Sequence, residues 1–114
     1  MGLDDAVLTI ATVNVNGIRA AFRRGMADWL AVRQPDVVLL QEVRAPDEMV
    51  GELLTPPAWD LAHSESMTKG RAGVAIASRL PMSAVRIGLD HGVATNSGRW
   101  VEADLELPGG GTLT

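Results

Sequence analysis

The sequence predicts an α/β protein in which a buried β-sheet is covered by helices. A β-branched run at residues 7–15 is followed by an amphipathic stretch at 18–33 and by a nearly continuous apolar run at 36–43. β-Branched and continuous apolar runs predict strands, the second of them buried on both faces. Apolar residues spaced three and four apart predict a helix between them. Strand, helix and strand in this order indicate a sheet with helices packed on it.

Two residues divide and end the predicted first helix. Gly25 lies inside the amphipathic stretch and predicts a division into two pieces. Pro35 ends the helix, because the residue before a proline resists the helical conformation. A second, shorter helix is predicted at residues 46–54, with Asp47 and Glu48 in its first turn, where the helix dipole favours acidic side chains.

The remainder of the chain predicts strands. Residues 100–107 alternate between apolar and acidic side chains, the pattern of a half-exposed strand. Residues 109–111 are glycines and predict a turn. Trp29, Trp59 and Trp100 are expected to lie in the core. The other segments that predict strands are 59–63, 73–78, 82–89 and the beginning of one at 112–114.

Composition places limits on the classes of function. The 114 residues correspond to one domain, and the absence of cysteine excludes disulfides and thiolate metal sites. The formal net charge of -4 weighs against a non-specific nucleic-acid binder, although the position of charges matters more than their sum. Residues 1–6 lack the pattern of a secretory signal, and no apolar stretch approaches the roughly 20 residues that span a bilayer. We therefore expect a cytoplasmic protein without a membrane partner.

Polar residues follow two of the predicted strands where each strand ends. Asn14 closes the first strand and Glu42 closes the second. Ligands bind beyond the carboxyl ends of strands in sheets of this kind, and amide and carboxylate oxygens suit Mg²⁺. The pattern fits equally a turn-capping asparagine and a solvated glutamate, and taken alone it favours that simpler interpretation.

His63 ends a predicted short strand and has no acidic residue beside it in the pattern. It is interpreted as a surface or loop histidine. A Ser-His-Asp triad is not indicated either, because no serine lies in a G-x-S-x-G turn.

Several motifs, in this order, resemble the opening of the exonuclease III family of AP endonucleases, within the wider endonuclease/exonuclease/phosphatase superfamily. They are TVNVNGIRA at 12–20, WL at 29–30, QPDVVLLQEV at 34–43 and KGRAGV at 69–74. The resemblance implies the N-terminal half of a four-layer α/β sandwich, a mixed β-sheet with covering helices. Residues 1–114 would form that half and stop before the catalytic C-terminal half, because the family's later YxPxG, GDxN and SDH motifs do not occur.

The resemblance also implies roles for individual residues. Glu42 matches the carboxylate that binds the catalytic metal, Mg²⁺ or alternatively Mn²⁺. Asn14 matches an active-site asparagine near the metal and the scissile phosphate, and Asn16 matches a position that supports the metal site. The catalytic residues would be Asn14 and Glu42, and the metal ligands Glu42, Asn14 and Asn16. The DNA-binding residues would be Arg19, Arg23, Arg24, Lys69, Gly70 and Arg71.

The function implied is that of a magnesium-dependent DNA-repair nuclease. Such an enzyme cuts double-stranded DNA at abasic sites and removes nucleotides from 3′ ends. Without the later motifs, the chain is expected to be inactive alone. Parts of residues 37–40 and 74–77 would remain bare unless the missing half or a partner chain covers them. Two alternatives stay open: a phosphodiesterase or phosphatase for small molecules, and a non-catalytic module that binds DNA or a partner.

Overall fold

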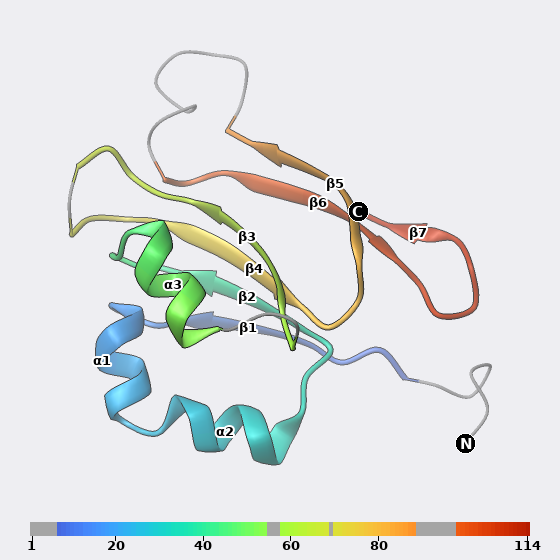
Figure 1. Cartoon of the computed structure of the whole chain (residues 1–114), viewed down its shortest axis with the longest axis horizontal. Helices are drawn as coiled ribbons and strands as arrows, with labels where there is room; N and C mark the ends of the chain where they lie inside the picture. The colour runs from blue at the N-terminus through green and yellow to red at the C-terminus, as the bar shows by residue number, and fades with distance from the viewer. Residues whose placement is uncertain (1–6, 55–57, 69, 89–97) are drawn as a thin grey trace.

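Four of the predicted strands pair into one mixed sheet in the computed structural model, which describes residues 7–54, 58–68, 70–88 and 98–114. The strand order is β1-β2-β4-β3, with β1 and β2 parallel and the other two pairs antiparallel (Figure 1). The strands are β1 (Ile10–Asn14), β2 (Val37–Gln41), β3 (Asp60–Ser64) and β4 (Val74–Ser78). This arrangement confirms the predicted mixed sheet.

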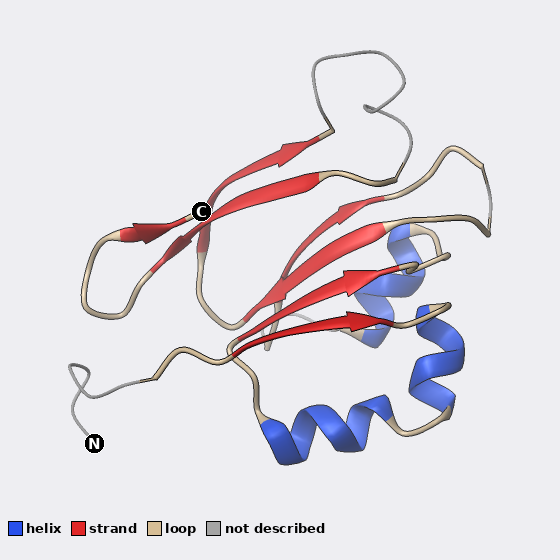
Figure 2. Cartoon of the chain, turned by 180° about the vertical axis from the view of Figure 1, so that it is seen from behind, coloured by secondary structure: helices blue, strands red, loops and turns tan. Residues whose placement is uncertain are grey.

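Three helices cover one face of this sheet, as Figure 2 shows from behind. They are α1 (Ile18–Arg23), α2 (Met26–Arg33) and α3 (Asp47–Leu53). Gly25 separates α1 from α2 at a φ of 107°, a left-handed conformation that glycine adopts without steric cost. The predicted division of the helix is therefore confirmed. No helix in the described part of the chain is long and apolar enough to cross a membrane.

The main core lies between the helices and the sheet. Val38 and Leu40 belong to it, while Val37 faces the opposite side and is also 1% exposed. Strand β2 is thus buried on both faces over Val37 and Val38, as its continuous apolar run predicts. The buried members of this core are Val15, Ile18, Met26, Leu30, Val38, Leu40, Val43, Val50, Leu54, Trp59, Ala75 and Ala77.

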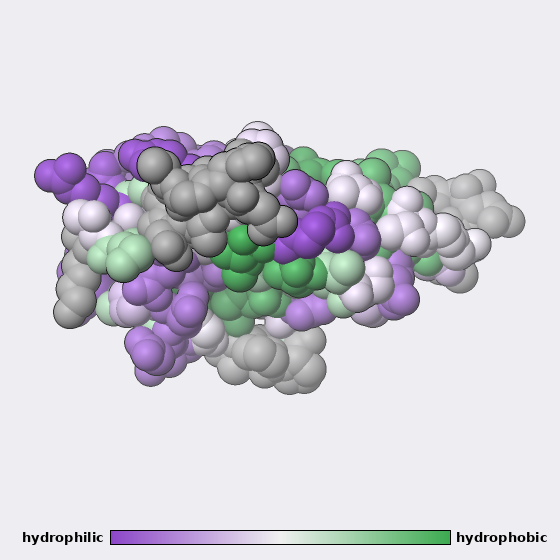
Figure 3. Space-filling model, turned by 90° about the horizontal axis from the view of Figure 1, so that it is seen from above, coloured by the Kyte–Doolittle hydropathy of each residue, from purple (hydrophilic) through white to green (hydrophobic). Residues whose placement is uncertain are grey.

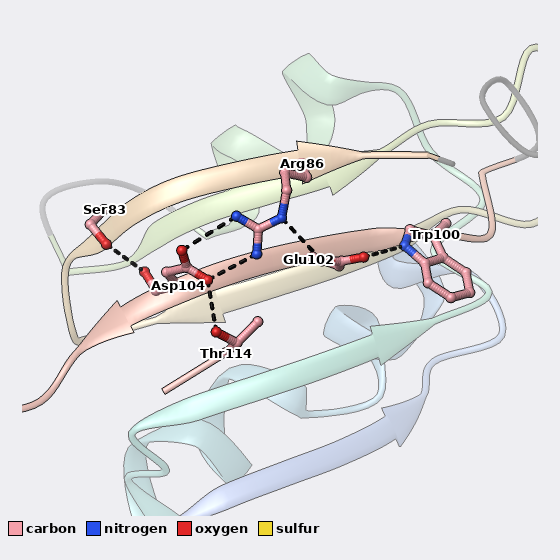
Figure 4. A network of polar contacts seen from close by, with 6 residues as sticks. All are labelled: Ser83, Arg86, Trp100, Glu102, Asp104 and Thr114. Carbon is pink, nitrogen blue, oxygen red and sulfur yellow. Dashed lines mark hydrogen bonds and ion pairs between the residues drawn. The ribbon is translucent and has the colours of Figure 1, made fainter. Parts of the chain in front are cut away.

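A second, antiparallel sheet packs beside the first. It consists of β5 (Met82–Ile87), β6 (Val101–Glu106) and β7 (Thr112–Leu113) in that order. Figure 4 shows Arg86 of β5 reaching across to β6, where it donates to Glu102 at 3.0 Å and to Asp104 at 2.9 Å. Hydrogen bonds from Arg86 and then from Thr114 lower the pKa of Asp104. The acidic side chains Glu102 and Asp104 are thus partly exposed and paired, whereas Ala103 and Leu105 between and beyond them are buried, which confirms the half-exposed strand.

An apolar cleft of about 430 Å³ lies between the two sheets. Leu39 and Ile76 line it from the first sheet and are only half-buried, whereas Val37 is buried. Seen from above, the molecule exposes hydrophobic surface next to hydrophilic surface (Figure 3). The expectation of a bare inner face therefore holds for part of that face, since the second sheet covers the rest.

Trp100 is not a core residue. Its side chain is 41% exposed, and its indole N–H donates to Glu102 Oε1 at 2.9 Å, on the exposed side of β6. The prediction was wrong because a paired indole N–H allows tryptophan to sit at a polar edge. Trp59 is buried in the core, and Trp29 packs against it half-buried.

The interpretation of His63 as a surface histidine without an acidic partner was also wrong. Its side chain is 4% exposed, and Nδ1 lies 2.7 Å from Oδ1 of Asp47, the first residue of α3. Glu65 accepts a hydrogen bond from the backbone N–H of Asp47 at 2.9 Å. The packing of α3 against the sheet brings these residues together, which the local pattern around His63 does not reveal.

We predict that Val38→Ala lowers the free energy of unfolding by about 2 kcal/mol, because two buried methyl groups are lost and a cavity remains. Val32→Ala is the matched control: Val32 is 80% exposed on α2, so the same truncation should be neutral or slightly stabilising. Urea denaturation followed by circular dichroism measures both values. Equal effects of the two substitutions would contradict the burial of β2.

A second prediction concerns Gly98, which joins two loops. Its carbonyl accepts from the Gly73 N–H at 2.8 Å, its φ is +69°, and a Cβ there would lie 2.6 Å from the Ser66 backbone nitrogen. Gly98→Ala should therefore destabilise the chain by about 2–4 kcal/mol, from the positive φ and the forced separation of the loops. A Cβ at Gly109 meets nothing within 4 Å, so Gly109→Ala should have little effect in the same denaturation experiment.

Candidate active site

Backbone pairing beyond β1 and β2 brings the two predicted site residues together. Asn14, the last residue of β1, lies opposite Gln41, the last residue of β2. The pairing continues past both strands, because the Val15 N–H donates to Gln41 at 3.0 Å and the Gly17 N–H donates to the Glu42 carbonyl at 2.8 Å. The side chains of Asn14 and Glu42 therefore meet at the carboxyl edge of the parallel pair, where ligands bind in such sheets.

Both oxygens of the Glu42 carboxylate accept hydrogen bonds. Asn14 Nδ2 donates to Oε2, and Arg44 Nη2 donates to Oε1 at 2.7 Å. The oxygen of the Asn14 amide accepts from the Asn16 backbone N–H at 3.0 Å, which fixes the orientation of the amide. The hydrogen bond from Asn14, and next that from Arg44, lowers the pKa of Glu42 below its usual value. Glu42 is thus held as an anion at the edge of the sheet.

The backbone around Glu42 adopts left-handed conformations that non-glycine residues rarely use. The φ values are 51° at Glu42, 53° at Arg44, 49° at Ala72 and 46° at Asn16. Each costs about 1–2 kcal/mol. Two backbone hydrogen bonds hold the segment after β2 against the loop before β4. The Val43 N–H donates to the Gly73 carbonyl at 2.9 Å, and the Arg44 N–H donates to the Ala72 carbonyl at 2.8 Å. Such conformations cluster at functional sites, where the surrounding structure imposes them.

A cleft of about 580 Å³ opens beside Glu42. Three arginines line it from three separate segments: Arg44 after β2, Arg71 in the loop between β3 and β4, and Arg99 before β6. Gly70 also lines the cleft. Guanidinium groups match the geometry of phosphate oxygens, so a phosphate group next to Glu42 is the ligand chemistry that this cleft fits.

Three of the other residues predicted to contact DNA are not among those that line this cleft. Arg19 is exposed in the first turn of α1, and Arg23 and Arg24 are exposed at its other end. Lys69 lies outside the described residues. All six DNA-contact assignments, including those of Gly70 and Arg71, remain predictions.

Sequence reasoning missed Arg44 and Arg99. Arg44 stands two residues after Glu42, close enough in the sequence for the two side chains to pair. That spacing of opposite charges, directly after the strand that carries the predicted metal ligand, was the available signal. Arg99 carried no comparable local signal, because only the packing of the second sheet brings it to the cleft.

The donor set at this edge suits a hard divalent cation. The Glu42 side chain is 39% exposed, and a carboxylate with room for water ligands is what Mg²⁺ requires. Asn14 turns its nitrogen toward Glu42 and its oxygen toward Asn16, so in this arrangement it orients the carboxylate. Asn16 contributes its backbone N–H and leaves an exposed side chain in the adjoining turn.

Asp47, His63 and Glu65 form a second group of ligand atoms, all within 4.8 Å of one another. His63 Nδ1 already pairs with Asp47, and Nε2 is buried without a hydrogen-bond partner among the described residues. A histidine that ligates a metal normally donates its other ring N–H to a neighbour. This group is therefore a poorer metal site than the Glu42 edge.

Comparison with known proteins gives a consistent family. Residues 11–113 match the Endonuclease/Exonuclease/phosphatase family. The chain is 28% identical over 99 residues to Recombination repair protein 1 of Drosophila melanogaster, covering 87% of this chain and 15% of that protein. It is 20% identical over 104 residues to a DNA-(apurinic or apyrimidinic site) endonuclease of Dictyostelium discoideum, covering 91% and 29%.

Solved structures agree. An AP endonuclease from Archaeoglobus fulgidus matches with a TM-score of 0.73 and 32% identity, over 87% of this chain and 37% of its own. The 3′ phosphatase NExo from Neisseria, bound to a product DNA hairpin, shares the fold with a TM-score of 0.66 and 24% identity, over 90% and 38%. This chain thus spans well under half the length of each of these four proteins.

The family match extends over nearly the whole chain, and the matched segment contains the paired Asn14 and Glu42. The chain therefore belongs to the Endonuclease/Exonuclease/phosphatase family, and AP endonucleases are among the proteins to which it is similar.

Proposed function

We propose that this chain forms part of a magnesium-dependent site that hydrolyses phosphodiester bonds in DNA, as an AP endonuclease and 3′–5′ exonuclease of the exonuclease III type. The observation that carries the proposal is the ionised Glu42, held by Asn14 and Arg44 at the carboxyl edge of β1 and β2. The AP endonucleases among its relatives support this reaction in preference to others of the family.

The chemistry follows from the residues present. Glu42 would hold Mg²⁺, with Mn²⁺ as an alternative, and the bound ion would polarise the phosphoryl oxygen and stabilise the negative charge that develops. Asn14 keeps the carboxylate in position. Arg71 and Arg99 face the cleft beside Glu42, where they would bind phosphate oxygens and position a DNA backbone without reading its sequence.

Double-stranded DNA with an abasic site or a 3′ end is the proposed substrate. The net charge of -4 does not oppose this, because three arginines converge where the phosphate would lie. We further infer that residues 1–114 are the N-terminal half of the catalytic domain. The remaining catalytic groups would come from outside this chain, since its match covers 37% of the Archaeoglobus fulgidus chain.

The contact between Asn14 and Glu42 is tested by titration. Asn14→Ala removes the largest cause of the lowered pKa of Glu42, so that pKa should rise toward its usual value. As the pH falls, Glu42 would then be protonated at a higher pH than in the unsubstituted chain. Metal binding through Glu42 would be lost at that higher pH, because protonation removes the ligand. A carbon-13 NMR titration of the Glu42 carboxyl measures the pKa.

Thr12→Ala is the control for this titration. Thr12 lies on the same strand as Asn14 and accepts a hydrogen bond from Gln41 instead of touching Glu42. Its substitution should leave the Glu42 pKa unchanged. If Asn14→Ala also leaves it unchanged, the contact does not exist in solution.

The substrate is tested by binding to a labelled duplex with one abasic site. We expect Mg²⁺ to strengthen binding, Glu42→Gln to abolish that increase, and Glu48→Gln, on the exposed first turn of α3, to preserve it. A soluble phosphodiester that competes as well as abasic DNA would instead favour a small-molecule phosphodiesterase. Salt-sensitive binding that ignores both Mg²⁺ and Glu42→Gln would indicate a non-catalytic module.

The same duplex serves to test catalysis. Turnover by the isolated chain should be absent or lower by several orders of magnitude than in complete relatives, because cooperating catalytic groups act as a unit. Turnover near that of a complete AP endonuclease would contradict the inference that essential groups lie outside these residues.

A further inference from the structure

The ion pair between Glu42 and Arg44 occupies the position where the proposed function requires a metal ion. Arg44 Nη2 lies 2.7 Å from Glu42 Oε1, while Asn14 engages the other oxygen. Each carboxylate oxygen therefore already accepts a hydrogen bond in the metal-free site. The inference that follows depends on the proposed function, because it takes Glu42 as the metal ligand.

We propose that Arg44 is the internal counter-ion of Glu42 in the metal-free site and must leave the carboxylate before a divalent cation binds there. The guanidinium group thereby sets the affinity of the site for the metal. Arg44 is a positioning residue in this role, since it acts through Glu42.

The two cations exclude one another on the same oxygen. A magnesium ion sits about 2.0–2.1 Å from a carboxylate oxygen and carries an ordered shell of water ligands. A guanidinium 2.7 Å from Glu42 Oε1 would crowd those waters and would repel the ion by its positive charge. Arg44 and a divalent cation would therefore compete for Glu42.

The Arg44 side chain can change rotamer, and the adjoining cleft can accept it. Its backbone is fixed by the hydrogen bond from its N–H to Ala72 at 2.8 Å, so only the side chain needs to change rotamer. That side chain is 43% exposed and borders the cleft of about 580 Å³ that Arg71 and Arg99 also line. Rotation into the cleft would place a third guanidinium beside the other two.

Displacement couples the metal to the phosphate ligand. Once released, Arg44 increases the positive charge of the cleft, and phosphate oxygens can neutralise it through charge-assisted hydrogen bonds. Because linkage is reciprocal, a phosphate ligand that captures Arg44 raises the affinity of Glu42 for the metal by the same factor. The site would thus bind the ion weakly without DNA and more tightly with it.

The test measures Mn²⁺ affinity from the electron paramagnetic resonance signal of the free ion. Arg44→Gln removes the charge that competes for Glu42, so its Kd for Mn²⁺ should fall about two- to fivefold below that of the unsubstituted chain, the upper part of the range for an exposed ion pair. Arg99→Gln is the matched control, because it removes the same charge from the same cleft without touching Glu42. Equal effects of the two substitutions overturn the proposal.

Glu42→Gln separates this inference from the proposed function. Placed in the unsubstituted chain and in Arg44→Gln, it should abolish Mn²⁺ binding in both. If binding persists in both, the ion binds elsewhere and the proposed function fails. If Glu42→Gln abolishes binding but Arg44→Gln does not tighten it, only the role of Arg44 is overturned. If neither the unsubstituted chain nor Arg44→Gln binds Mn²⁺, the role of Arg44 is also overturned.

A second readout does not depend on the stability of Arg44→Gln. The Nε–H resonance of Arg44 in the unsubstituted chain should shift on titration with Mg²⁺, and it should stay in place in Glu42→Gln. A purely structural arginine would show no such shift. An Arg44 resonance that ignores saturating Mg²⁺, while Glu42 responds, overturns displacement.

Discussion

The parallel pairing of β1 and β2, continued beyond the ends of both strands, is the constraint on which the site depends. Hydrogen bonds from Val15 to Gln41 and from Gly17 to Glu42 keep the two chain segments in register where regular strand geometry has already ended. Beneath them, Val37 and Val38 of β2 are buried on opposite faces of the sheet, so packing on both sides holds this part of the strand. The Asn14 and Glu42 side chains meet because neither segment can shift independently.

The electrostatics of the site are local. The chain carries more acidic than basic residues, yet Glu42 faces three arginines drawn from different parts of the sequence. Two of them lie in loops that backbone hydrogen bonds pin against one another, through Gly73 and Gly98. Under the proposed function, a single carboxylate next to a cluster of guanidinium groups would bind a cation and a phosphate together, and net charge is a poor guide to such a local arrangement.

The loops that surround Glu42 are held by contacts between residues that have no role in the proposed reaction. His63 and Asp47 tie the start of α3 to the end of β3, directly before the loop that carries Gly70 and Arg71. Gly98 approaches Ser66 so closely that no side chain fits between them. Rigid supports of this kind permit the left-handed conformations at Glu42 and Arg44, which an unsupported loop would relax.

Local patterns in the sequence were sufficient to predict an α/β protein with helices covering a buried sheet, the division of the helix at Gly25 and the half-exposed β6. Strand periodicity, glycine and proline determine backbone conformation over a few residues, so their effects can be predicted without knowledge of the fold. The meeting of Asn14 and Glu42 was also predictable, because parallel strands end at one edge. The pairing of His63 with Asp47, the exposure of Trp100 and the arrival of Arg99 beside Glu42 were decided only by the tertiary structure. Each depends on how separate elements pack, and burial and ion pairing between residues distant in sequence leave no periodic trace in the chain.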